Sequence, residues 1–141
     1  MMEPLHFHYD VDGRDFTSAG EASVKVKKLL RQLSFSPEII RRISVAMYEG
    51  EINMVIHANG GDADVYIDDN TILIRLQDTG PGIANIPLAM QEGYSTAPDN
   101  VRTLGFGAGM GLPNMKRYSD EMKIQSEVGK GTTIELIYNI G

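Results

Sequence analysis

The chain has 141 residues, of which 42% are hydrophobic and 23% charged, and its formal net charge is −6. These values predict a single soluble domain over residues 1–141, and the acidic balance argues against nucleic-acid binding, which needs a basic surface. With no cysteine, no signal peptide and no membrane-length apolar segment, the sequence predicts a cytoplasmic protein without disulfides, thiolate metal sites or a membrane partner.

The first half of the chain alternates between the periodicities of strands and helices. Hydrophobic residues alternate with polar ones near the N-terminus, and longer stretches with helical spacing follow a capping-box pattern at residues 18–21 and the pair Ser36-Pro37. The predicted elements are a strand over 5–11, helices over 18–33 and 37–58, and strands over 63–67 and 72–78.

The second half is less regular at first. Residues 84–104 lack a clear period, and an aperiodic stretch of this length inside a small domain is more often a functional lid than a plain connection. A helix over 109–118 and a hairpin of strands 121–128 and 132–140 complete the chain. Hairpins without parallel crossovers predict an α+β fold, a two-layer α/β sandwich with a mixed, mostly antiparallel sheet.

Three polar residues recur at intervals of four along the predicted second helix: Glu49, Asn53 and His57. This spacing places them on one helix face, where the ordinary interpretation is a solvated stripe. His57 alone favours a structural histidine. Glu51 lies off this stripe, and we expect it to face water.

Asp78 has the same strand parity as Ile72, Ile74 and Leu76, which places its carboxylate on the apolar face of the sheet. A buried carboxylate needs a partner. That partner is either the backbone of an Asx turn at Thr79 or a donor on a ligand. Because an ionised carboxylate only accepts hydrogen bonds, it would prefer the amino edge of adenine to the carbonyl edge of guanine.

Glycines alternate with other residues from Gly105 to Gly111, just before the predicted helix. Glycine lets backbone N–H groups approach an anion, and a helix start adds unpaired N–H groups. The run therefore indicates a phosphate site, although a plain loop is the more common meaning of such a run taken alone.

Taken in order, these segments resemble the sequence boxes of the GHKL ATPase superfamily, which includes gyrase, mismatch-repair ATPases and histidine kinases. Within it, the chain is most similar to the bacterial anti-sigma-factor and switch-protein serine kinases. The matching segments are Glu49 to Asn53, Asp78 to Gly82, Gly105 to Leu112, and Gly131 to Thr133.

The resemblance implies a site for ATP and Mg²⁺. Glu49 would be the catalytic general base, and Asn53 would hold the metal. Asp78 would bind the adenine amino group. The remaining nucleotide-binding positions that it implies are Gly80, Gly82, Ile83, Gly105, Gly107, Gly109, Met110, Gly111, Leu112 and Thr132.

The resemblance also implies a protein serine/threonine kinase whose substrate is a STAS-domain antagonist. Further partners in this family are a sigma factor or a switch phosphatase, and a second copy of the chain as a homodimer. Two alternatives stay open: a non-catalytic, ATP-dependent binding module such as an anti-sigma factor, and the catalytic domain of a histidine kinase. The N-terminal strand fits the serine-kinase branch better than the histidine kinases.

Overall fold

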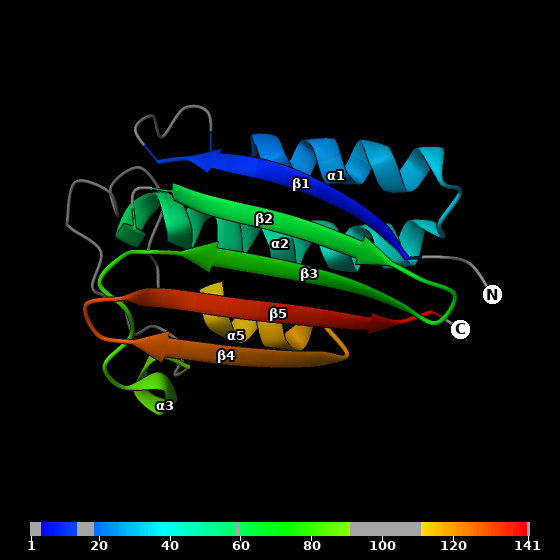
Figure 1. Cartoon of the computed structure of the whole chain (residues 1–141). Coiled ribbons are helices and arrows are strands. Elements are labelled where there is room, and N and C mark those ends of the chain that lie inside the picture. Colours follow the sequence, from blue (N-terminus) through cyan, green and yellow to red (C-terminus); the bar gives the residue numbers. More distant parts are fainter. Residues whose placement is uncertain (1–3, 14–18, 59, 91–110, 141) are drawn as a thin grey trace.

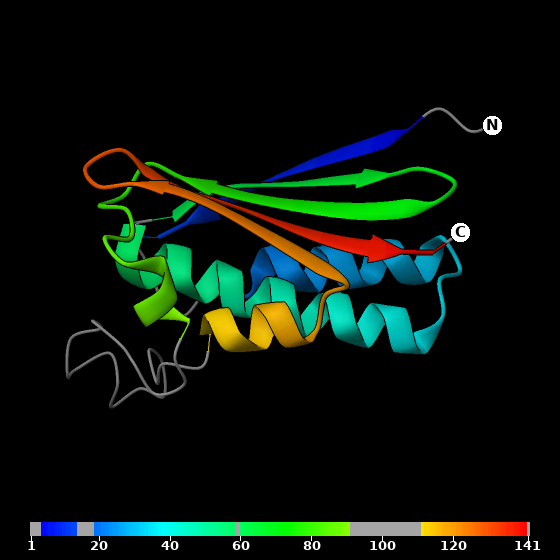
Figure 2. The same ribbon diagram turned by 90° about the horizontal axis from the view of Figure 1, so that it is seen from below.

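The computed structural model describes residues 4–13, 19–58, 60–90 and 111–140. These residues form one sheet with helices packed on one of its faces, as Figures 1 and 2 show from two directions. The strands are β1 (Leu5–Asp12), β2 (Gly60–Ile67), β3 (Thr71–Asp78), β4 (Glu121–Glu127) and β5 (Gly131–Asn139). The helices are α1 (Glu21–Gln32), α2 (Pro37–Ala58), α3 (Ile86–Ala89) and α5 (Gly111–Arg117).

The five strands lie in the order β1-β2-β3-β5-β4, and every neighbouring pair is antiparallel. The predicted α+β two-layer fold is therefore confirmed, with a sheet that is antiparallel rather than mixed. Burial alternates along the inner strands, where Val65, Ile74 and Leu136 are completely buried. This period of two directs one face toward the helices and the other toward solvent.

Helix α2 is the centre of the helical layer. It packs against α1 on one side and α5 on the other, beneath the middle of the sheet (Figure 2). Gly50 makes this close packing feasible, because a β-carbon there would lie 2.2 Å from Leu76 Cδ1 and 2.9 Å from Met115 Cε. Helix α2 therefore has buried residues on more than one side.

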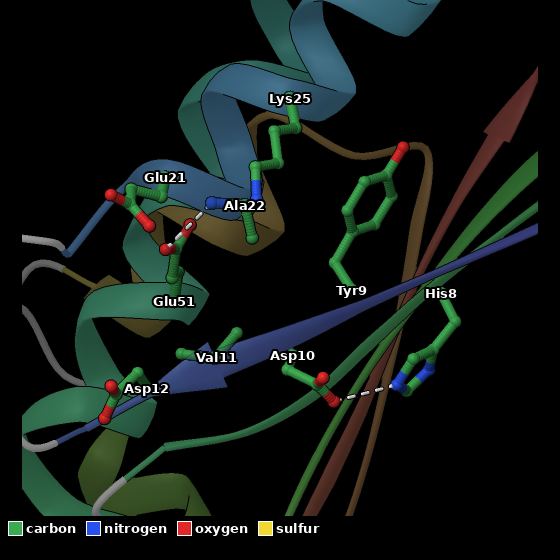
Figure 3. Close-up of a pocket in the computed structure, with 9 residues that line it drawn as sticks. All are labelled: His8, Tyr9, Asp10, Val11, Asp12, Glu21, Ala22, Lys25 and Glu51. Carbon is green, nitrogen blue, oxygen red and sulfur yellow. Dashed lines mark hydrogen bonds and ion pairs between the residues drawn. The ribbon is translucent and has the colours of Figure 1, made fainter.

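Helix α1 begins differently from the prediction. Its N-cap is Gly20, with a φ of 101° and no side-chain cap of its own, while Ser18 of the predicted capping box lies outside the described residues. The carboxylate of Glu51 on α2 caps the helix instead (Figure 3). It accepts hydrogen bonds from the backbone N–H groups of Gly20 (2.8 Å), Ala22 (3.2 Å) and Ser23 (2.9 Å).

The expectation that Glu51 faces water is wrong: only 2% of this residue is exposed. The Ser23 hydroxyl donates a further hydrogen bond of 2.7 Å to the same carboxylate. Four donors and the positive end of the α1 dipole compensate for the removal of this charge from water. Glu51 therefore joins α1 to α2.

We expect Glu51→Ala to lower the free energy of unfolding by about 2–4 kcal/mol, because it leaves buried N–H donors without an acceptor. Urea denaturation followed by circular dichroism measures this change. Glu21→Ala is the matched control, since Glu21 is an exposed acid in the first turn of the same helix and contributes only about 0.3–1 kcal/mol through the dipole. Equal losses in the two variants would contradict the capping role.

The segment predicted to be a lid lies partly outside the described residues, since its positions 91–104 are not among them. Its first residues form the short helix α3, where Asn85 Oδ1 accepts a hydrogen bond from the Leu88 N–H. None of the helices in the described ranges combines the length and the apolar character that crossing a bilayer requires.

Candidate functional site

The predicted polar stripe lies on the second half of α2. Glu49, Asn53 and His57 are half-buried, in contrast to the buried neighbours Gly50, Ile52, Met54 and Val55. Burial lowers the pKa of His57, and the nearby Asp78 carboxylate acts in the opposite direction. Burial thus favours the neutral form of the His57 imidazole, which lies beside Asp78 at the end of β3.

Asp78 is the last residue of β3 and lies on the sheet face that the sequence predicts. Its Oδ1 accepts hydrogen bonds from the Gly80 N–H (3.0 Å) and from the Thr132 N–H on β5 (3.2 Å). In the described part of the chain, no group donates a hydrogen bond to Oδ2. One oxygen thus stabilises the turn, as the Asx-turn interpretation requires, and the described residues leave the other without a protein donor.

Ser126 on β4 is a residue of this site that sequence reasoning missed. Its Oγ accepts a hydrogen bond from the Ile83 N–H (2.7 Å), and it also lies 2.9 Å from Thr132 Oγ1 and 3.1 Å from the Gly131 carbonyl oxygen. Asp78, Thr132 and Ser126 are register partners on three neighbouring strands. Ser126 therefore holds the loop after β3 against the β4–β5 hairpin.

The glycines of that loop are required by close contacts. A β-carbon at Gly80 would lie 2.5 Å from Ala58 Cβ, so only glycine lets the loop cross the end of α2. Gly82 has a φ of +78°, and a β-carbon there would lie 2.4 Å from the Glu127 carbonyl oxygen. Both residues thus position Asp78 and Ile83 through the backbone.

The start of α5 lies against the polar stripe. A β-carbon at Gly111 would lie only 2.9 Å from Asn53 Nδ2 and 3.1 Å from Asn53 Oδ1. Leu112, by contrast, has its side chain in the core. The other predicted phosphate-binding positions, Gly105, Gly107, Gly109 and Met110, lie outside the described residues.

The structure thus brings three distant segments to one end of the two layers. Asp78 lies beside the last turn of α2. Asn53 lies about one helical turn before that point and Glu49 about two turns before it, so the line from Glu49 to the last turn is about 12 Å long. Along this line, Asp78 offers a hydrogen-bond acceptor, Asn53 a side-chain amide and Glu49 a second carboxylate, and all three residues are half-exposed. They fit a ligand with an amino donor at one end and a metal-bound anion at the other.

Comparison with known proteins gives the family. Residues 39–140 match the model of the histidine kinase-, DNA gyrase B-, and HSP90-like ATPases. This chain belongs to that ATPase family. The matched range includes the whole line from Glu49 to Asp78 and the β4–β5 hairpin, so the chain has an ATP-binding domain.

Named relatives place the chain within the anti-sigma-factor branch of these ATPases. It is 34% identical over 121 residues to an anti-sigma F factor of a Geobacillus species, covering 82% of this chain and 80% of that protein. It is 35% identical over 118 residues to the anti-sigma F factor of Clostridium acetobutylicum, covering 80% of this chain and 79% of that protein. These relatives confirm the resemblance read from the sequence boxes.

Solved structures confirm the fold. The RsbU and RsbW domains of Rv1364c from Mycobacterium tuberculosis superpose with a TM-score of 0.63 at 17% identity, over 97% of this chain and 32% of that chain. A chain of the SiaB–SiaC complex from Pseudomonas aeruginosa gives a TM-score of 0.58 at 11% identity, over 95% of this chain and 89% of that chain. The ATPase fold is therefore shared with proteins of low sequence similarity.

Proposed function

We propose that this chain is a single-domain protein serine kinase that transfers the γ-phosphate of ATP to a serine of a STAS-domain antagonist. The observation that carries the proposal is the line of groups along α2, where Glu49 and Asn53 stay half-exposed one turn apart and Asn53 contacts the start of α5. Glu49 would supply phosphoryl transfer with a general base for the attacking hydroxyl, a group that nucleotide binding alone does not use.

In this proposal each residue has a separate task. Asp78 Oδ2 accepts a hydrogen bond from the adenine amino group, while Gly80, Gly82, Ile83 and Thr132 shape the loop and strand around the base. Glu49 accepts the proton of the attacking serine hydroxyl. Asn53 would hold Mg²⁺ through its side-chain oxygen, and this ion, when bound, neutralises charge on the phosphate oxygens. Backbone N–H groups of Gly105 to Leu112 would contact the phosphates.

Regulation of a partner belongs to the same proposal. The anti-sigma F factors to which the chain is homologous support a role in partner switching, and SiaB forms a complex with SiaC. The proposed partners are thus a STAS-domain antagonist and a sigma factor or switch phosphatase, met in the cytoplasm, with a homodimer as the proposed assembly.

A second candidate is a binding module in which ATP sets the affinity for a partner and no phosphate is transferred. The name of the relatives favours it, because an anti-sigma factor acts by binding a sigma factor. The two candidates make different predictions for the fate of the γ-phosphate.

The test is to incubate the full chain with γ-labelled ATP, Mg²⁺ and STAS-domain proteins from the same genome. We expect label on a serine of one STAS protein, identified by mass spectrometry. ATP-dependent complex formation without transfer of label to any STAS protein would favour the binding module and contradict the kinase.

A further inference from the structure

A cluster of metal-ligating side chains lies on the face of the sheet that the helices leave uncovered. His8 and Asp10 alternate along β1 and point to the same side, and Asp62 lies on the adjacent strand β2, where it is the register partner of Asp10. Figure 3 shows the contact between His8 and Asp10 on the side of β1 away from α1. This cluster is therefore separated by the sheet from the candidate nucleotide site.

The spacing of the ligand atoms suits a small tetrahedral ion. His8 Nε2 lies 3.1 Å from Asp10 Oδ1 and 3.5 Å from Asp62 Oδ1, and all the ligand atoms of the three residues lie within 4.8 Å of one another. Zinc bound to nitrogen and oxygen at its usual bond lengths holds neighbouring ligand atoms about 3.4 Å apart. The two distances from the imidazole nitrogen to the carboxylate oxygens bracket that value.

A second carboxylate orients the histidine. His8 Nδ1 lies 2.9 Å from Asp64 Oδ1, so with its proton on Nδ1 the ring donates to Asp64 and directs the Nε2 lone pair toward Asp10 and Asp62. Asp64 Oδ1 also lies 2.8 Å from His6 Nε2, and the His6 ring stacks on Tyr66 with centroids 4.4 Å apart. A carboxylate behind a histidine ligand is the usual outer support of a zinc site.

The charges at this edge also favour a cation. Asp10 and Asp62 face each other across the strand pair, an arrangement in which like charges destabilise a sheet, and Asp64 adds a third carboxylate next to them. An imidazole among the ligands selects zinc over Mg²⁺ and Ca²⁺, which prefer all-oxygen sites. Since all three ligands are exposed, water can complete the coordination and the ion can enter directly.

We propose that His8, Asp10 and Asp62 form a zinc site on the open face of the β1–β2 edge, with Asp64 as the residue that positions His8. The site is independent of nucleotide, because its ligands lie on the opposite face of the sheet from Asp78.

The test is calorimetric titration of zinc chloride into the full chain after chelator treatment and dialysis, without nucleotide. We expect one zinc ion per chain, loss of that binding in His8→Ala, and affinity lower by roughly 10–100-fold in Asp64→Asn. Glu121→Gln, an exposed acid at the opposite edge of the sheet, is the matched control and should bind zinc like the parent chain.

Three results would overturn the proposal: no saturable binding to the parent chain, undiminished binding to His8→Ala, or equal binding of magnesium and zinc. Far-ultraviolet circular dichroism of each variant confirms that it is folded. NMR of the imidazole protons adds a direct readout, because zinc on Nε2 shifts the His8 signals at substoichiometric zinc and leaves those of His57 in place.

Discussion

Glu49→Ala is expected to reduce phosphoryl transfer to the STAS partner by about a hundredfold or more, with ATP affinity nearly unchanged. The reason is that a general base acts on the serine proton in the transition state and contributes little to nucleotide binding. Single-turnover transfer of labelled phosphate measures the first quantity, and calorimetric titration with ATP measures the second. Asn53→Ala, which removes the proposed metal ligand, should impair both.

The choice of control for Glu49 depends on the structure. Glu51 lies only two residues away and is equally acidic, but its burial makes Glu51→Ala a stability variant, so it cannot report on catalysis. Glu38→Ala is suitable, because Glu38 is exposed in the first turn of the same helix. If Glu49→Ala transfers phosphate at the parent rate, Glu49 is not the base.

Asp78→Asn is the second variant with a large expected effect. In the variant, the amide oxygen can still accept hydrogen bonds from the Gly80 and Thr132 N–H groups, so the turn should survive. The new NH₂ group, which is a hydrogen-bond donor, takes the place of Oδ2, which is an acceptor. Opposite the adenine amino group, that change places donor against donor. We expect ATP affinity to fall by about 10–100-fold and the preference for ATP over GTP to narrow.

Titrating ATP and GTP into both proteins separates recognition from folding. The urea midpoint of Asp78→Asn should stay close to that of the parent, which shows that any loss of affinity is local. An unchanged ATP affinity in the variant, or a parent that binds both nucleotides equally, would mean that Asp78 does not read the base.

Local periodicity predicted the strands and part of the site. Strand parity placed Asp78 on the core face correctly, because alternation along β3 is strict and has no exception from Ile72 to Leu76. Helical spacing likewise placed Glu49, Asn53 and His57 together. These are short-range relations, which a sequence expresses directly.

The errors concern contacts between distant residues. Its position off the polar stripe predicts that Glu51 faces water, yet Glu51 lies four residues from both Met47 and Val55, which are buried. A central helix has core on the side opposite its functional face, and the acid is stable there only because the N–H groups of α1 meet it. Nothing local to Glu51 encodes that partner.

Ser126 was missed for a similar reason. Its parity on β4 places it beside Thr132, but its contact with the Ile83 N–H joins positions 43 residues apart. The geometry of the loop after β3, fixed by Gly80 and Gly82, decides which hairpin residue it meets. Such a contact depends on the assembled layers.

The antiparallel order of the sheet leaves β1 and β4 as its two borders, each with a row of backbone groups that another strand could pair with. Both borders carry ionisable side chains at alternate positions, His6, His8 and Asp10 on one and Glu121, Lys123 and Glu127 on the other. If a strand of another chain paired with β1 or β4, it would have to lie beside these charged side chains, which disfavours aggregation through the sheet edges. Among the described elements, the charged side chains on β1 and β4 therefore disfavour edge-to-edge pairing of two copies of the sheet.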